Sequence, residues 1–268
     1  MRFSFTTFSM PRSTLAEVLA MARELGYDGI EPRLDAKHAH GIELNTCPAQ
    51  RHAIREQFQA AGVALACIAT PCSFSNPAIA AKQVDAAKRY LDLAADLGCG
   101  RIRVFGGEVP EGVPRDAAQS CLIGSLRSLA PHAHSRGVTV CMETHDAWCD
   151  TAIVAFIMDE VDHPGVGVVW DVMHTQRTGQ ATMEEAHQVL RPWIRHVHVH
   201  DGLNRTDVLR IVPIGTGDFN HAAVLRTLRH DRYTGFISGE WIESCMEPEL
   251  FDGHLRRELQ ALKRLAAG

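Results

Sequence analysis

Glycines that look like helix ends recur along the chain at an almost constant spacing. Gly26, Gly62, Gly98 and Gly137 are separated by 36, 36 and 39 residues, and a short apolar run follows each of them. Glycine is common just after a helix because it adopts the left-handed backbone conformation without strain. The chain is therefore expected to repeat a unit of one helix and one strand.

Eight strand-like runs alternate with eight helical segments over the whole length. The first helix is the best defined, because Thr14 and Glu17 form a capping box at its start. The predicted strands are 2–8, 27–31, 63–70, 101–105, 138–143, 166–171, 195–200 and 236–241. The predicted helices are 14–25, 48–61, 76–98, 115–136, 151–159, 182–190, 221–229 and 248–266.

This alternation predicts an α/β protein with a single (β/α)8 TIM-barrel domain over residues 1–268. No linker rich in proline or serine and no run of charge divides the chain. A doubly wound open sheet is the alternative. Against it, no G-x-G-x-x-G motif follows the first strand, where a Rossmann-type sheet would carry one.

The composition indicates that the ligand or substrate of the protein is a small molecule. The 27 Lys and Arg residues against 32 Asp and Glu residues give a net charge of -5, which argues against nucleic-acid or membrane partners. The 8 cysteines form no C-x-x-C pair, as expected for reduced thiols. The chain has no apolar signal core at its start and no window of ~18 apolar residues. We therefore expect a cytoplasmic protein, with homo-oligomerisation left open.

Four consecutive strand-like runs end in residues that bind metals. Glu143 and Asp171 close two of the runs, His198 lies near the end of the next, and Glu240 closes the last. Active sites of TIM barrels lie where the strands end, so adjacent strands would bring these four side chains together. Three carboxylates and one imidazole suit one divalent ion, with Mn²⁺ favoured and Mg²⁺, Co²⁺ or Zn²⁺ possible.

The strand at 195–200 has a pattern that can be checked internally. His196, His198 and His200 share one face, while Val197 and Val199 share the other. The valines suit the side covered by helices, so the histidines are expected to point into the barrel. His196 would then lie one layer below His198, where a hydrogen-bonded core histidine is expected, and His200 would lie at the mouth.

The order of these residues resembles the xylose-isomerase-like TIM-barrel sugar isomerases and epimerases. That group includes D-tagatose 3-epimerase, hydroxypyruvate isomerase and inosose-processing enzymes, and the similarity covers nearly the whole chain. The segments that carry it are 142–145, 170–174, 196–201, 213–218 and 239–241.

The resemblance implies a role for each matching residue. Glu143, Asp171, His198 and Glu240 would bind the metal, and Glu143 and Glu240 would also serve as catalytic acid and base. His174 would contact substrate oxygens. The implied reaction is isomerisation or epimerisation of a small hydroxy-ketone or hydroxy-aldehyde, in which the metal stabilises an enediolate.

Two positions depart from the pattern of the group. Cys149 stands where epimerases of the tagatose type have a substrate-contacting glutamate, and His200 stands where lysine is common. Both changes weaken the expectation of a free ketohexose substrate. Arg205, in the loop after the seventh strand, is a candidate substrate contact, with a solvated loop charge as the alternative.

Other functions stay open at this point. A dehydratase or lyase that resembles 3-dehydroshikimate dehydratases would use the same enolate to expel a hydroxyl group. Endonuclease IV-type repair enzymes share the barrel, but the third and fourth strands end without the histidines that their three-metal cluster needs. A non-catalytic sugar-binding barrel is the third possibility.

Two loops carry weaker signals. The segment from Gly215 to Gly217 precedes a helix and could bind phosphate through backbone N–H groups, although Asp218 or Asn220 as a helix cap explains it equally well. His38 and His40 lie in a long loop that could close over a substrate, with flexible loop histidines as the alternative.

Overall fold

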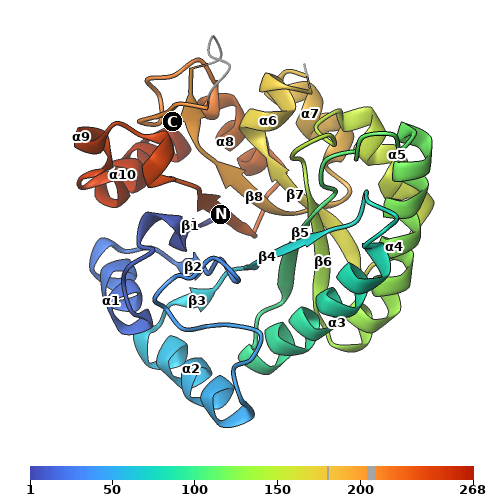
Figure 1. The fold of residues 1–268 in the computed structure, drawn as a ribbon. Coiled ribbons are helices and arrows are strands. Elements are labelled where there is room, and N and C mark those ends of the chain that lie inside the picture. Colours follow the sequence, from blue (N-terminus) through green and yellow to red (C-terminus); the bar gives the residue numbers. More distant parts are fainter. Residues whose placement is uncertain (180, 204–208) are drawn as a thin grey trace.

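A computed structural model describes residues 1–179, 181–203 and 209–268 as a barrel of parallel strands surrounded by helices (Figure 1). The sheet has the strand order β3-β2-β1-β11-β8-β7-β6-β5-β4, and every neighbouring pair in it is parallel. Its strands are β1 (Arg2–Thr6), β2 (Gly29–Glu31), β3 (Ala64–Leu65), β4 (Ile68–Ser73), β5 (Arg101–Phe105), β6 (Thr139–Glu143), β7 (Val166–Asp171), β8 (Ile194–Val199) and β11 (Phe236–Gly239). A short antiparallel pair, β9 (Asp201–Gly202) and β10 (Ile211–Val212), follows β8.

The two ends of the sheet belong to one stretch of chain, so the sheet forms a barrel. Only two residues separate β3 from β4, β3 pairs with β2, and β4 pairs with β5. An isolated bridge between Arg33 and Ala69 joins the two sides across the break. The (β/α)8 barrel is confirmed, and the open sheet is wrong. The predicted third strand is interrupted, and its register shifts around Pro71, which has no N–H to donate to a neighbour.

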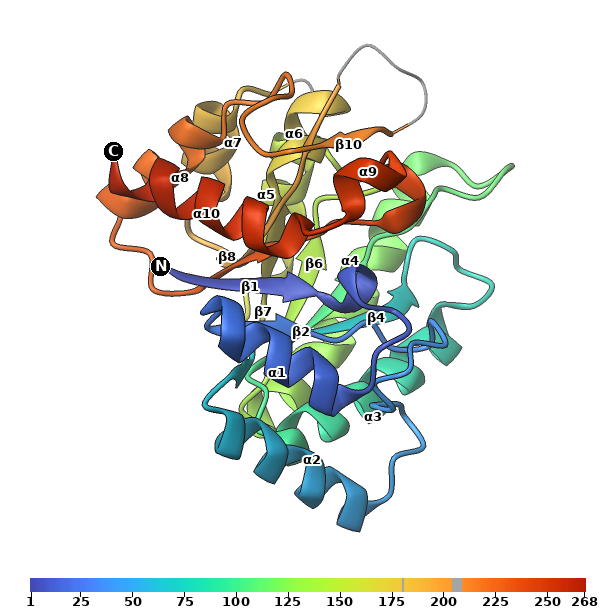
Figure 2. The same ribbon diagram turned by 90° about the vertical axis from the view of Figure 1, so that its left-hand side faces the viewer.

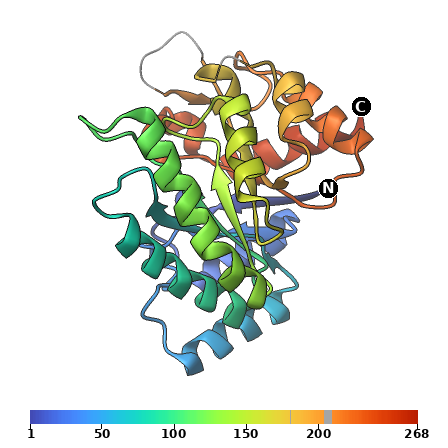
Figure 3. The same cartoon turned by 90° about the vertical axis from the view of Figure 1, so that its right-hand side faces the viewer.

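Helices form the outer ring. They are α1 (Leu15–Leu25), α2 (Pro48–Ala61), α3 (Ala80–Leu97), α4 (Arg115–Ser135), α5 (Thr151–Val161), α6 (Val172–Arg177), α7 (Met183–Leu190), α8 (His221–His230), α9 (Pro248–Phe251) and α10 (His254–Ala267), with 3-10 turns η1 (Thr7–Ser9) and η2 (Glu243–Cys245). The two chain ends lie on the same side of the molecule (Figure 2, Figure 3). The hydroxyl group of Tyr27 and the guanidinium of Arg229 both donate to backbone carbonyls of α10, so this helix links the start of the ring to its end.

Helix ends follow the sequence pattern closely, with one exception. Gly26, Gly62 and Gly98 each end a helix in the left-handed conformation, and the capping box of Thr14 is present. The predicted helix 248–266 is instead divided into α9 and α10. Gly253, with a φ of 64°, adopts the left-handed conformation between them and so breaks a periodicity that the sequence shows as continuous.

Large side chains fill the space between strands and helices. Val197 and Val199 are buried on the outer face of β8, as the alternation predicts. Trp148 is fully buried, and its indole N–H donates to the carbonyl of Gly107 at 2.7 Å. Its ring lies directly against Gly106, where a Cβ atom would overlap it. In the part of the chain that is described, no helix has the length and apolar character needed to cross a bilayer.

A buried carboxylate organises the loop that follows β10. Asp201 accepts hydrogen bonds from the backbone N–H groups of Gly202 at 2.9 Å, Gly215 at 2.8 Å and Gly217 at 3.0 Å. A Cβ atom on Gly217 would overlap this carboxylate. Asn220 caps α8 by accepting from the N–H of Ala223. The loop amides therefore have a partner within the chain, which removes the reason to propose a phosphate there.

We expect Asp201→Ala to lower the free energy of unfolding by about 2 kcal/mol, because the buried N–H of Gly202 and the part-buried N–H groups of Gly215 and Gly217 lose their shared acceptor. Urea denaturation measures the change. The control is Glu249→Ala, which removes an exposed carboxylate and should change stability by less than about 0.5 kcal/mol. Equal stability of the two variants would contradict the role given to Asp201.

Candidate active site

The four side chains predicted as metal ligands meet at one end of the barrel. Glu143, Asp171, His198 and Glu240 each offer one ligand atom, and these atoms lie within 4.8 Å of one another. They come from the ends of β6 and β7, from β8, and from the residue after β11, which are neighbours in the sheet. All four are buried. The structure thus brings the predicted set together, while its role as a metal centre stays a prediction.

Local hydrogen bonds fix the orientation of Asp171. Its Oδ1 accepts from the backbone N–H groups of Met173 at 3.0 Å and His174 at 3.1 Å, and so caps α6. Its own N–H donates to the hydroxyl oxygen of Thr144 at 2.9 Å. The other carboxylate oxygen, Oδ2, accepts no hydrogen bond from the described residues and lies 3.0 Å from Nε2 of His200. Oδ1 thus caps α6, and Oδ2 faces the ligand cluster.

His198 lies at the centre of the site. Its Nδ1 is 2.7 Å from Oε1 of Glu143 and 3.3 Å from Oε2 of Glu240. Its Nε2 is 3.1 Å from both carboxylate oxygens of Glu31. Burial disfavours a charged ring, but the carboxylates of Glu31 and Glu143 outweigh burial and raise the pKa of His198 well above its usual value.

A buried arginine, which the sequence analysis did not identify, supports Glu143. Nε of Arg103 lies 3.2 Å from Oε2 of Glu143, and the guanidinium also donates to the carbonyl of Thr70 at 2.9 Å. Its planar face lies over the ring of Phe105, 3.9 Å from the ring centroid. Burial raises the pKa of Glu143, but the charges of Arg103 and His198 overcome this effect and lower it below the usual value.

The donor set fits a divalent cation. Three carboxylates buried within 4.8 Å of one another repel each other, and in the interior this repulsion is costly unless positive charge lies between them. Asp171 Oδ2 accepts no hydrogen bond from the described residues, and its one ion-pair contact among them is to His200, so this oxygen keeps lone-pair capacity for a cation. Oxygen ligands with one imidazole suit a hard or borderline ion.

Two further histidines lie next to the cluster. The imidazole of His174, the predicted substrate contact, is buried, and burial lowers its pKa. Its ring meets that of His145, with centroids 4.5 Å apart. Burial disfavours the charged form of His145, but its hydrogen bond to Asp146 and the charge of Glu143 raise its pKa to about 9. These contacts favour the protonated form of His145 in the metal-free protein.

The remaining sequence candidates have different outcomes. Arg205 lies outside the described residues. Cys149 is buried, and its thiol donates to the carbonyl of Asp146. His40 does not act as a free loop side chain, because Nδ1 accepts from the N–H of Ile42 and Nε2 lies 3.1 Å from the carbonyl oxygen of Arg33. His38 contacts the hydroxyl group of Thr7 at 2.9 Å.

Sequence analysis also missed Glu31 and Arg33. Glu31 ends the second strand-like run in the same way as Glu143 ends the fifth, so the rule that found the ligands applied to it as well. Arg33 follows two residues later. Burial, together with the nearby charge of Arg103, lowers the pKa of Arg33 to about 10. Two arginines thus lie on the side of the site formed by β2 and β5.

Known proteins share the fold and the length of the chain. Residues 19–265 match the family model described as xylose isomerase-like TIM barrel. A curated relative from Bacillus anthracis, named 3-dehydroshikimate dehydratase, is 23% identical over 264 residues, covering 90% of this chain and 91% of the relative.

Two solved structures resemble this one over nearly their whole length. A D-psicose 3-epimerase in the presence of D-fructose has a TM-score of 0.81 at 18% identity and covers 100% of both chains. The probable 3-DHS dehydratase of petrobactin synthesis from Bacillus anthracis has a TM-score of 0.79 at 21% identity, covering 98% of this chain and 99% of that one. At these identities the likeness shows the fold.

We expect Mn²⁺ binding to the metal-free protein to release a proton. The raised pKa of His198 keeps the ring protonated, and Nδ1 must lose its proton before it can bind an ion. Apparent affinity should therefore rise with pH, by up to about tenfold per unit below that pKa. Calorimetric titration in buffers of different ionisation enthalpy measures the protons released.

The control for this titration is Asp171→Asn, which should bind Mn²⁺ weakly at every pH because it loses a ligand charge. Mn²⁺ affinity that does not change with pH would contradict the expected competition between the proton and the metal at His198.

Proposed function

Because the chain belongs to the xylose isomerase-like TIM-barrel family, we propose that it is a divalent-metal-dependent isomerase or epimerase. Its substrate would be a small hydroxy-ketone or hydroxy-aldehyde, and the reaction would transfer a proton at the carbon next to the carbonyl group. The buried convergence of Glu143, Asp171, His198 and Glu240 carries this proposal. It joins a cation site to two carboxylates that can exchange a proton with a carbon atom.

In the proposed reaction, the ligands, the two carboxylates and His174 would have different roles. A divalent ion bound by the four ligands would stabilise the negative charge that develops on substrate oxygen as the proton leaves. Glu143 and Glu240 come from β6 and from the end of β11, and β7 and β8 lie between these strands. The two carboxylates can therefore approach a substrate from different sides. His174 is available to hydrogen-bond to a substrate hydroxyl group.

Glu240 is the better placed of the two carboxylates to remove the first proton. Glu143 is engaged by Arg103 and by His198, and its lowered pKa makes it a weak base. Glu240 is 8% exposed, and its one ion-pair contact among the described residues is to His198, at 3.3 Å. We assign the base to Glu240, which becomes protonated when it takes the proton and can then give it back to the substrate, while Glu143, held ionised by Arg103 and His198, would serve as a metal ligand.

Dehydration is the second candidate, and His145 favours it. The contacts of this histidine favour its protonated form in the metal-free protein, and it lies beside His174 and Glu143. A protonated imidazole at this place can donate to a departing hydroxyl group, which a β-hydroxy ketone loses once its enolate has formed. Arg33 and Arg103 would suit a substrate that carries a negative charge. The curated relative is named for a reaction of this class.

We expect the Mn²⁺-loaded protein in D2O to introduce deuterium next to the carbonyl group of D-fructose or of 3-dehydroshikimate, used as probes of the two candidate reactions. Glu240→Gln should slow this exchange by at least about 100-fold, because the base is lost. Its Mn²⁺ affinity should fall as that of Asp171→Asn does, since each variant loses one ligand charge, so the exchange rates are compared at saturating Mn²⁺. Exchange at the wild-type rate in Glu240→Gln would contradict the assignment.

The mass of the product separates the two candidates, because isomerisation conserves mass and dehydration removes one water. If the protein dehydrates its substrate, the His145→Gln variant should remove water from the substrate about 100-fold more slowly, while deuterium exchange persists. Only the departure of the hydroxyl group needs the acid. If it isomerises, His145→Gln should affect exchange and turnover equally. Mass spectrometry of both products after a fixed time measures the difference.

A further inference from the structure

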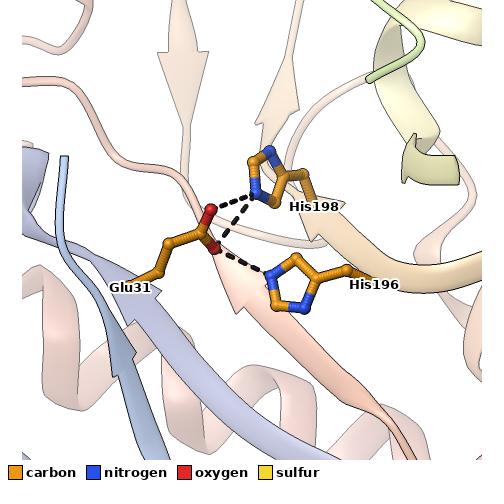
Figure 4. Close-up of side chains that lie close together, drawn as sticks. All are labelled: Glu31, His196 and His198. Carbon is orange, nitrogen blue, oxygen red and sulfur yellow. Dashed lines mark hydrogen bonds and ion pairs between the residues drawn. The ribbon is translucent and has the colours of Figure 1, made fainter. Parts of the chain in front are cut away.

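A fourth carboxylate lies beneath the cluster of ligands. Glu31, at the end of β2, is fully buried. It reaches the histidines of β8 across the barrel interior, from a strand that is separated from β8 in the sheet by β1 and β11. Figure 4 shows its carboxylate directed at the rings of His196 and His198. Neither the metal ligands nor the acid and base proposed above include it.

Both contacts of Glu31 are to the same kind of atom. Oε2 is 2.8 Å from Nε2 of His196, and both carboxylate oxygens are 3.1 Å from Nε2 of His198. A carboxylate only accepts hydrogen bonds, so each of these nitrogens carries a proton. Nδ1 of His196 has no partner among the described residues, as expected of a neutral ring whose one proton is on Nε2.

The other nitrogen of His198 faces the opposite way. Nδ1 points to Glu143 and Glu240, at 2.7 and 3.3 Å, on the side where Asp171 also lies. A neutral imidazole has one proton and one ring lone pair. Nδ1 of His198 also faces carboxylates, so both of its nitrogens carry a proton in the metal-free protein. When an ion displaces the proton of Nδ1 and Nε2 keeps its proton for Glu31, the lone pair of Nδ1 is directed at the ligand cluster.

We propose that Glu31 is a positioning residue of the metal centre: its hydrogen bond to Nε2 of His198 selects the tautomer in which Nδ1 is the metal ligand. His196 donates to the same carboxylate and so fixes its orientation. The inference rests on the proposed metal centre and adds to it the group that prepares one ligand. Partners of this kind orient a ligating imidazole and increase its basicity.

The same three residues also have the composition of a separate cation site. Such a site would need lone pairs on Nε2 of both histidines. His198 would then have to place its proton on Nδ1, the nitrogen that faces Glu143 and Glu240. A neutral His198 in this form has no lone pair to offer to the four-residue site. The two arrangements therefore exclude each other for a neutral ring, and the tautomer of His198 distinguishes them.

The first test is Co²⁺ affinity, measured by the visible absorption of the bound ion, in the wild type and in two variants. Glu31→Gln keeps the size of the side chain, but its amide N–H₂ can donate to Nε2 and so favour the wrong tautomer. We expect Co²⁺ to bind it about 10 to 100-fold more weakly, with an altered spectrum. Glu258→Gln is the matched control, because Glu258 is also fully buried and accepts from the N–H of Ile214, away from the cluster.

The control separates positioning from packing. A residue with only a packing role would lower the thermal stability of the metal-free protein and leave Co²⁺ affinity unchanged, and Glu258→Gln is expected to behave in this way. Equal Co²⁺ affinity in Glu31→Gln and the wild type would overturn the inference about Glu31 and leave the metal centre intact. A wild-type protein that binds no Co²⁺ would instead overturn the proposed function.

The second test uses the wild type and does not depend on how a variant folds. In Zn²⁺-loaded protein with ¹⁵N-labelled histidine, NMR should show His198 with a proton on Nε2 and the metal on Nδ1. His196 should show a neutral ring protonated on Nε2. Metal on Nε2 of His198, or a second bound Zn²⁺ that shifts Nε2 of His196, would overturn the proposal in favour of the separate cation site.

Discussion

The burial of negative charge at one end of the barrel is the constraint on which the rest of the structure depends. Glu31, Glu143, Asp171 and Glu240 are all at most 8% exposed, and they surround the histidines of β8. Charge at this depth is tolerated only with compensating partners. Arg103 and His198 supply part of that compensation, and a divalent ion would supply more. The closed sheet makes the arrangement possible, because it places the ends of β6, β7, β8 and β11 side by side.

Much of this could be predicted, because the relevant signals are local in the sequence. A glycine after each helix and a polar residue after each apolar run identified the barrel and the four clustered residues. The position of Glu31 had the same local signal as Glu143, but its role depends on a contact with His196, 165 positions later in the chain. Arg103 was missed because it lies inside β5. The sequence does not show whether its side chain points into the barrel or toward the outside, and only the contact with Glu143 establishes this. The interruption after β3 has no sequence signal stronger than Pro71.

The residues that would decide the outcome of the proposed reaction differ from those that form the scaffold. The cluster sits on strands whose geometry is shared with proteins named as an epimerase and as a dehydratase. The features that would separate these reactions lie beyond the strand ends, in His145 and in Arg33. A shared fold identifies the family and leaves the product open, because the reaction depends on the residues of the site and not on the barrel.

The contact between Trp148 and Gly106 restricts how this mouth can change over evolution. Because the indole occupies the volume of any side chain at position 106, replacing that glycine would displace the tryptophan from its buried position. A change at position 106 or at position 148 alone would disturb the packing between them. A variant with a different wall at this place therefore needs either a poorly packed intermediate or simultaneous changes at both positions. The contact between one ring and one hydrogen atom therefore couples positions 106 and 148, and we expect this wall to change only when both residues change.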